Sequence, residues 1–301
     1  DADKKTEIAK TGILDTVTMI NYRWSEDIFL KNEVHPDGKN HGMVMYVDWS
    51  GSMSNILQDT IEQLLVLVEF CRKVNIPYEV YAFSSNEYCP FDSYDQRDEY
   101  DKWRQDRAEQ WTSTCDTDVT PHTFQLYNWL SSRMNKRQYQ TGLSNLWLLT
   151  QACAQYGAGN PRCFRLGCTP LNEAIICAMA QVPEFQRMHG VQIVNSVFLT
   201  DGEGHSMVRY GYSGKNFLTD KKSKKNYEID YHGRNSETMI LLQMLKSSTG
   251  CNTIGIRLHD SKNINGLRYN YESTDFQKLA KQYKTQNYIT LPSSYDEYFL
   301  V

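Results

Sequence analysis

The chain contains a short apolar run that ends in an acidic, hydroxyl-rich turn and leads directly into an amphipathic segment. Residues 44–47 (VMYV) are followed by residues 48–52 (DWSGS), and residues 55–74 then place apolar side chains at helical intervals. This pattern predicts a buried strand, a tight polar loop and a helix. In open α/β sheets, ligands bind at the carboxyl ends of the strands, where this loop is expected to lie.

The side chains of the loop indicate a possible metal site. It carries one carboxylate, Asp48, and two hydroxyls, Ser50 and Ser52, while Gly51 allows a tight turn. Oxygen donors without sulfur or imidazole suit a hard divalent cation such as Mg²⁺. A second interpretation needs no metal, because Ser52 or Ser54 could simply cap the following helix. The loop alone leaves both interpretations open.

Two distant segments add the same kind of side chain. Residues 167–171 (GCTPL) place a threonine directly before an apolar helix predicted over 172–180. Residues 191–200 (VQIVNSVFLT) are a second buried-strand candidate, which ends at an aspartate. The resulting set of oxygen donors is Asp48, Ser50, Ser52, Thr169 and Asp201.

In the motifs DxSGSM, GxTPL and TDGE, the chain resembles the von Willebrand factor A (VWA) family. The resemblance implies that the five residues form a metal-ion-dependent adhesion site, which holds Mg²⁺, or Mn²⁺ or Ca²⁺. A Glu or Asp of a partner protein would complete the metal's coordination. The implied fold is Rossmann-like, and the alternation of predicted strands and helices likewise predicts an α/β, doubly wound, mostly parallel sheet with helices on both faces.

The flanking residues 10–15 (KTGILD), 26–29 (EDIF) and 39–45 (KNHGMVM) are similar to VWA proteins of large tailed bacteriophages. Those proteins resemble the CobT subunit of cobaltochelatase, and the likeness spans most of residues 10–205. It implies a non-catalytic adaptor subunit for a hexameric AAA+ ATPase of the MoxR or CobS kind, in the cytoplasm of the host cell. We expect the partner also to meet Trp49, Glu203 and His205 around the metal.

Two other classes of function stay open. A metal-dependent hydrolase, such as a nuclease or phosphatase, needs a general base or a second metal, and Glu203 and His205 are the candidates near the site in sequence. An RNA-binding VWA protein is the third possibility. The net charge of −4 counts against it, because it gives no general attraction to nucleic acid or anionic membranes.

Composition and segment lengths bound the remaining classes. The 301 residues include 20 tyrosines, which argues against disorder. No apolar run has the length of a membrane span, and no signal peptide opens the chain, which starts without a methionine and is expected to lack an upstream part. The eight cysteines are scattered and form no CxxC pair, which favours reduced cytosolic thiols over disulfides or a zinc site.

The predicted organisation is an N-terminal extension, residues 1–42, followed by a VWA domain, residues 43–301. Residues 27–34 are expected to form a hairpin with residues 43–47. An insertion at about 86–160 is interpreted as an acidic, aromatic loop followed by two helices. A second insertion at about 204–234 is interpreted as a hairpin with several lysines at its turn. The other elements expected are strands over 78–83, 253–258 and 287–291, the last of the chain, and helices over 237–246 and 273–283.

Overall fold

The computed structural model describes residues 7–14, 29–34, 40–85, 98, 102, 105–106, 124–154, 164–201, 204, 207, 216–220, 223–229, 236–257, 273–286, 288–291 and 293–301. The chain divides into two compact units, Asp1–Asn40 and His41–Val301. In the first unit, β1 (Glu7–Leu14) pairs antiparallel with β2 (Phe29–Val34). The expected hairpin between residues 27–34 and 43–47 is wrong, because residues 43–47 are paired on one side by residues 78–82 and on the other by residues 195–199.

The second unit is built on a seven-stranded sheet in the order β10-β11-β9-β6-β3-β4-β5. The five strands from β11 to β4 are parallel, and the two edge strands, β10 and β5, run antiparallel to their neighbours. The prediction of an α/β fold with a mostly parallel sheet is confirmed. The strands are β3 (His41–Asp48), β4 (Tyr78–Ser84), β5 (Gln125–Ser131), β6 (Ile193–Thr200), β9 (Asn252–Arg257), β10 (Ile289–Thr290) and β11 (Glu297–Leu300).

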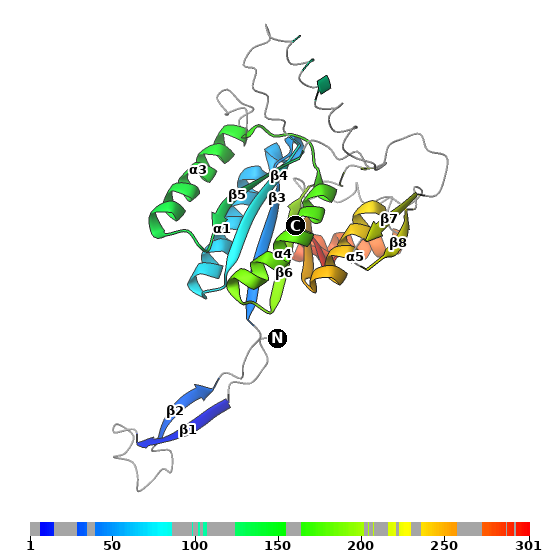
Figure 1. Cartoon of the computed structure of the whole chain (residues 1–301). Coiled ribbons are helices and arrows are strands. Elements are labelled where there is room, and N and C mark those ends of the chain that lie inside the picture. The colour runs from blue at the N-terminus through cyan, green and yellow to red at the C-terminus, as the bar shows by residue number, and fades with distance from the viewer. Residues whose placement is uncertain are drawn as a thin grey trace. The chain divides into compact units, whose positions relative to one another are not determined.

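Helices pack against the sheet in two groups. Helices α1 and α3 lie side by side, and so do α4 and α5 (Figure 1). A short 3-10 helix, η2 (Gly51–Asn55), precedes α1. The helices are α1 (Leu57–Lys73), α3 (Lys136–Ala154), α4 (Leu171–His189), α5 (Ser236–Thr249) and α6 (Ser273–Gln286).

The central strand β3 shows why its sequence reads as one apolar run. Met45 and Val47 belong to a core cluster that contains residues of α1 and α3, whereas Val44 and Tyr46 belong to a cluster that contains residues of α4 and α5. Successive side chains of a strand point to opposite faces, so both faces of β3 are buried under helices. The strand therefore needs apolar residues at every position until it reaches Asp48.

The segment after β4 differs from the prediction of two helices. Residues 125–131 form the edge strand β5, and only residues 136–154 form a helix, α3. The pairing of β5 with β4 shifts between Val80 and Tyr81, which face Leu130 and Asn128. Trp129 is thus the extra residue of a bulge. The aromatic loop predicted within 86–120 lies outside the described residues, except for positions 98, 102, 105 and 106.

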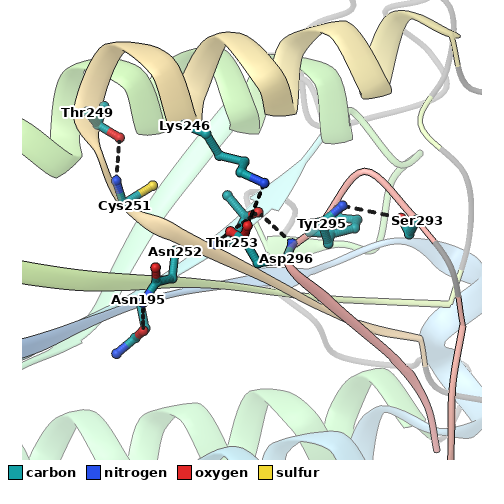
Figure 2. Close-up of polar contacts among 9 residues, drawn as sticks. All are labelled: Asn195, Lys246, Thr249, Cys251, Asn252, Thr253, Ser293, Tyr295 and Asp296. Atoms are coloured by element: carbon teal, nitrogen blue, oxygen red, sulfur yellow. Dashed lines mark hydrogen bonds and ion pairs between the residues drawn. The ribbon is translucent and has the colours of Figure 1, made fainter. Parts of the chain in front are cut away.

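The C-terminal edge of the sheet is held by a polar cluster around Asp296 (Figure 2). One carboxylate oxygen of Asp296 accepts hydrogen bonds from the backbone N–H of Thr253, at 2.7 Å, and from its hydroxyl, at 3.0 Å. The other oxygen pairs with Lys246 Nζ of α5 at 2.5 Å. These contacts join the start of β9 and α5 to β11, a strand that the sequence analysis missed when it took residues 287–291 as the last.

Two tyrosines pack tightly over β9 at the same edge. Tyr295 and Tyr298 stack with ring centroids 5.5 Å apart. A Cβ atom on Gly255 would lie 2.6 Å from the Tyr298 ring and 2.9 Å from the Tyr295 ring. Any larger residue at position 255 would overlap these rings.

The remaining elements agree with the sequence analysis. Residues 216–220 (β7) and 225–229 (β8) form the expected antiparallel hairpin, and Lys224 lies in its turn with a φ of 57°. Helix α5 ends just before Gly250. The five described cysteines are free thiols. Among the described residues, no helix combines the length and apolarity needed to cross a membrane.

Candidate metal centre

The centre of the site is the point where two adjacent strands end. Strands β3 and β6 are parallel neighbours, with Val47 opposite Leu199. Each strand continues one residue further, to Asp48 and Thr200. The Thr200 hydroxyl donates a hydrogen bond to Asp48 Oδ2 at 2.7 Å. The strand pairing therefore brings together side chains that are 152 positions apart in the chain.

Asp48 is an acid in a buried and crowded position. Its side chain is 0% exposed, and Oδ1 accepts no hydrogen bond from any described residue. The pKa of Asp48 is raised from 3.8 to about 7: burial is the largest cause and the charge of Asp201 adds to it, while the hydroxyls of Thr200, Ser50 and Thr169 partly offset the rise. A buried carboxylate oxygen without a donor favours either a proton or a cation beside it.

A chain of hydrogen bonds links the serines to the second acid. Ser52 Oγ donates to Asp201 Oδ1 at 3.0 Å, and Ser50 Oγ lies 3.0 Å from Ser52 Oγ. A serine hydroxyl has one proton, so Ser50 is the donor to Ser52. The two serines thus position Asp201 relative to the β3 loop, as the sequence pattern predicts.

Thr169 reaches the same place through backbone pairing. Gly51 N donates to Gly167 O at 2.8 Å, and Gly167 N donates to Trp49 O at 3.2 Å, which forms an isolated parallel bridge beside Ser50. Thr169 follows two residues later, just before Pro170, the N-cap residue of α4. Its hydroxyl lies close enough to lower the pKa of Asp48. All five predicted donors therefore gather at one edge of the sheet.

The alternative in which Ser52 or Ser54 is the N-cap residue of the following helix is wrong. Helix α1 begins at Leu57, and its N-cap residue is Ile56, whose side chain makes no capping hydrogen bond. Ser50 is the N-cap residue of η2 but also makes no side-chain capping bond. Instead, the hydroxyls of Ser50 and Ser52 are hydrogen-bonded to each other, and Ser52 donates to Asp201.

Exposure increases from the strand ends outward. Asp48, Ser50 and Thr169 are buried, with 0%, 1% and 7% of their surface exposed. Asp201 is half-buried and Ser52 is exposed. The set therefore opens to the surface on the side of Ser52 and Asp201.

Trp49 does not have the role predicted for it as a partner contact. Its side chain is 0% exposed, packs edge-on against Trp129 at 4.4 Å between ring centroids, and donates from Nε1 to Phe164 O at 2.8 Å. A partner on the surface cannot touch such a residue. Trp49 instead fixes the backbone that leads to Thr169. The other two predicted contacts, Glu203 and His205, lie outside the described residues.

The segment that follows Asp201 packs on the first turns of two helices. Met207 N donates to Glu237 Oε2 of α5 at 2.8 Å. A Cβ on Gly204 would lie 3.1 Å from Asn172 Oδ1 of α4, which accepts a hydrogen bond from Thr238 at 2.6 Å. Both helices carry an acid in their first turn, Glu173 in α4 and Glu237 in α5.

Two contributors were missed by the sequence analysis. Thr200 is a positioning residue for Asp48. Its place at the end of a predicted strand, directly before Asp201, is the sequence signal that could have identified it. Phe164 acts through its backbone carbonyl, which accepts the Trp49 indole N–H, and no sequence pattern marks such a contact.

The donor set fits a hard cation. It offers two carboxylates and three hydroxyls, all of them oxygen, together with the unpaired Asp48 Oδ1. Among the described residues, no group of three or more His, Cys, Asp or Glu side chains could hold a metal. This site has only two side chains of those kinds, so its cation would depend on the hydroxyls.

No protein-family model and no curated protein matches the chain. Among solved structures, it is similar to the open conformation of the pilus adhesin SpaC of Lactobacillus rhamnosus GG, with a TM-score of 0.40 and 15% identity over 88% of this chain and 28% of the adhesin. It is also similar to a mutant of the PilB minor pilin of Streptococcus sanguinis, with a TM-score of 0.37 and 14% identity over 79% of this chain and 55% of the pilin. The chain thus spans less than two thirds of each of these two proteins.

Proposed function

We propose that this protein is a metal-dependent protein-binding module with the doubly wound architecture of a VWA domain. The order of its strands supports the architecture. Read from β5 to β11 with the short edge strand β10 left out, the sheet order is β5-β4-β3-β6-β9-β11. When these six strands are numbered along the chain from β3, the order is 3-2-1-4-5-6. This is the order of doubly wound sheets, in which ligands bind where the order reverses. The reversal here lies between the neighbouring strands β3 and β6. Asp48 is the last residue of β3, and Asp201 directly follows β6.

The observation that carries the proposal is the cluster of five oxygen-donor side chains with a free lone pair on Asp48. Asp48 lies at its buried end, and the Ser50–Ser52–Asp201 hydrogen-bond chain leads to its exposed end. Bound Mg²⁺ supplies an open coordination position that a carboxylate of a partner can take. The three hydroxyls are neutral, so Asp48 and Asp201 carry the charge that offsets the cation, and a partner carboxylate would be attracted by the metal itself at the open position.

The donor residues have different roles at the buried and the exposed end of the site. Asp48 provides charge at the buried end, where Thr200 fixes the orientation of its carboxylate. Asp201 provides charge at the surface and is positioned by Ser52. Thr169 precedes α4, so its hydroxyl is carried by a rigid element. Binding would thus be lost when any of the charged or bridging groups is removed, without damage to the core.

The expected partner follows from the family resemblance. CobT-like proteins make a hexameric AAA+ ATPase the candidate, with this chain as its adaptor in the cytoplasm. The partner would offer a Glu or Asp to the metal. The segment after Asp201, held by Glu237, would form part of the surrounding wall.

Affinity capture with the whole chain tests this function when it is run with Mg²⁺ and with EDTA. We expect an AAA+ ATPase to be retained by the wild-type protein with Mg²⁺, and to be lost with EDTA or with Asp48→Ala. Asn55→Ala, an exposed neighbour outside the donor set, is the control and should retain the partner. Full retention by Asp48→Ala in EDTA would show that docking does not use the metal. Mg²⁺-dependent phosphoester hydrolysis that disappears in Asp48→Ala would favour a hydrolase instead.

A further inference from the structure

A cavity of about 480 Å³ lies between α3 and the edge strand β5. Helix α3 contributes Leu146, Leu148, Leu149 and Ala152 to its lining, and the rings of Trp129 and Phe164 contribute the remaining apolar wall. Pockets that hold small molecules have volumes of roughly 300–1,000 Å³. The cavity therefore has the size of a ligand site, and none of the five metal donors lines it.

The bulge in β5 explains why the sheet and helix do not close up here. In a regular strand, Trp129 and Leu130 would point to opposite faces. Because of the bulge, both belong to the core cluster under α1 and α3. Two large side chains in succession hold α3 away from the strand. Bulges commonly redirect a side chain toward a functional site in this way.

The chemistry of the lining selects the kind of ligand. The residues that line the cavity include no charged side chain, and their polar side chains include the amides of Asn128 and Asn145. The Asn128 amide already donates to Glu79 at 2.7 Å, whereas Asn145 is exposed. Leu148, also in the lining, is 65% exposed, which is unfavourable for a large apolar side chain in water. An uncharged, largely apolar molecule would cover it.

We propose that this cavity binds a small, uncharged, apolar molecule with an aromatic ring. Trp129 and Phe164 line the cavity, and aromatic side chains attract the ring of such a ligand. A helix or a second copy of the chain is a poorer fit, because the apolar surface is concave and has the volume of a small molecule. The site stands independently of the proposed metal-dependent function.

The cavity also adjoins the metal loop through one residue. Trp49, which follows Asp48, packs on Trp129 and holds the carbonyl of Phe164. Both of these neighbours line the cavity. A ligand that displaces either ring would thus act on the backbone next to the metal donors.

Fluorescence titration of the metal-free whole chain with N-phenyl-1-naphthylamine, an uncharged aromatic probe, tests the site. Ala152→Trp fills the cavity, and Leu148→Asp places a charge in its lining. Their matched controls are Ala180→Trp, on the exposed side of α4, and Val66→Asp, on α1, where Val66 is 66% exposed. We expect saturable binding to the wild type and both controls, and at least about tenfold weaker binding to both cavity variants.

Three results would overturn the proposal. One is the absence of saturable binding to the wild type. Another is binding that is unchanged in both cavity variants, or equally weakened in the controls. Should Ala152→Trp unfold, the exposed Leu148→Asp decides alone. The third is a dimer, seen by sedimentation, that Leu148→Asp dissociates and Val66→Asp does not, because the cavity would then be an interface between copies. Because no metal is added, failure here leaves the metal proposal untouched, and the reverse also holds.

Discussion

Thr200 Oγ1 donates a hydrogen bond to Asp48 Oδ2 across 2.7 Å, which joins the ends of two adjacent parallel strands. Both residues are buried, so the carboxylate has little access to water to replace this donor. Thr200 therefore determines which oxygen of Asp48 remains free. The site depends on this contact as much as on the five donors recognised from the sequence.

Replacing Thr200 by Val keeps the shape of the side chain and removes the donor. Loss of one partner of a buried polar group costs about 1–3 kcal/mol, so we expect the free energy of unfolding to fall by that amount. The pKa of Asp48 should rise, and Mg²⁺ affinity at neutral pH should weaken with it. Urea denaturation and calorimetry measure the two effects. Thr200→Ser, which keeps a hydroxyl, should restore most of the Mg²⁺ affinity, and an unchanged affinity in Thr200→Val would contradict the positioning role.

The raised pKa of Asp48 predicts opposite pH dependences for the fold and the metal. Its pKa is raised from 3.8 to about 7, chiefly by burial, so between these pH values the folded chain holds a proton that the unfolded chain releases. The metal-free protein should therefore lose stability as the pH rises from about 4 through 7. Mg²⁺ must displace that proton, so its affinity should rise by roughly tenfold per pH unit below 7 and level off above it. Thermal unfolding and Mg²⁺ titrations at pH 5.5 to 8.5 check both trends, and flat profiles would contradict them.

Ser52→Ala isolates the bridging role of an exposed residue. Ser52 links Ser50 to Asp201 but buries little surface, so we expect stability to change by less than about 0.5 kcal/mol. Mg²⁺ affinity should fall at least about tenfold, because both a donor and the support of Asp201 are lost. Asn55→Ala, equally exposed and close in sequence, should leave the affinity unchanged. Equal affinities of the two variants would remove Ser52 from the site.

Gly255→Ala tests the packing of the C-terminal strand. The added Cβ would overlap the rings of Tyr295 and Tyr298, and overpacking of this kind costs about 1–3 kcal/mol. We expect a lower melting temperature with little change in Mg²⁺ affinity, because Gly255 lies on β9, which β6 separates from β3. A melting temperature equal to that of the wild type would mean that β11 does not pack as described.

Much of the central sheet could be predicted from the sequence because its strands are buried on both faces. Residues 44–47 and 191–200 read as apolar runs, each followed by an aspartate, and Asp48, Ser50, Ser52 and Asp201 follow from their positions at these ends. Thr169 followed instead from its place directly before an apolar helix. The edge strand β5 was misread for a physical reason. Phe124 and Leu126 alternate as a strand requires, but the bulge makes Trp129 and Leu130 face the same side, which imitates helical spacing. The strand β11 was missed because it is only four residues long. Its position depends on the contact between Asp296 and Lys246, which no local pattern reveals.

Calorimetric titration of Mg²⁺ into the wild-type chain and into Asp48→Asn tests the central claim most directly. The substitution keeps the size of the side chain and removes its charge. We predict one weak-to-moderate Mg²⁺ site in the wild type at pH 8, no detectable binding in Asp48→Asn, and little affinity of either protein for Zn²⁺. Equal Mg²⁺ binding by the two proteins, or tight Zn²⁺ binding without Mg²⁺ binding, would contradict the assignment of this site.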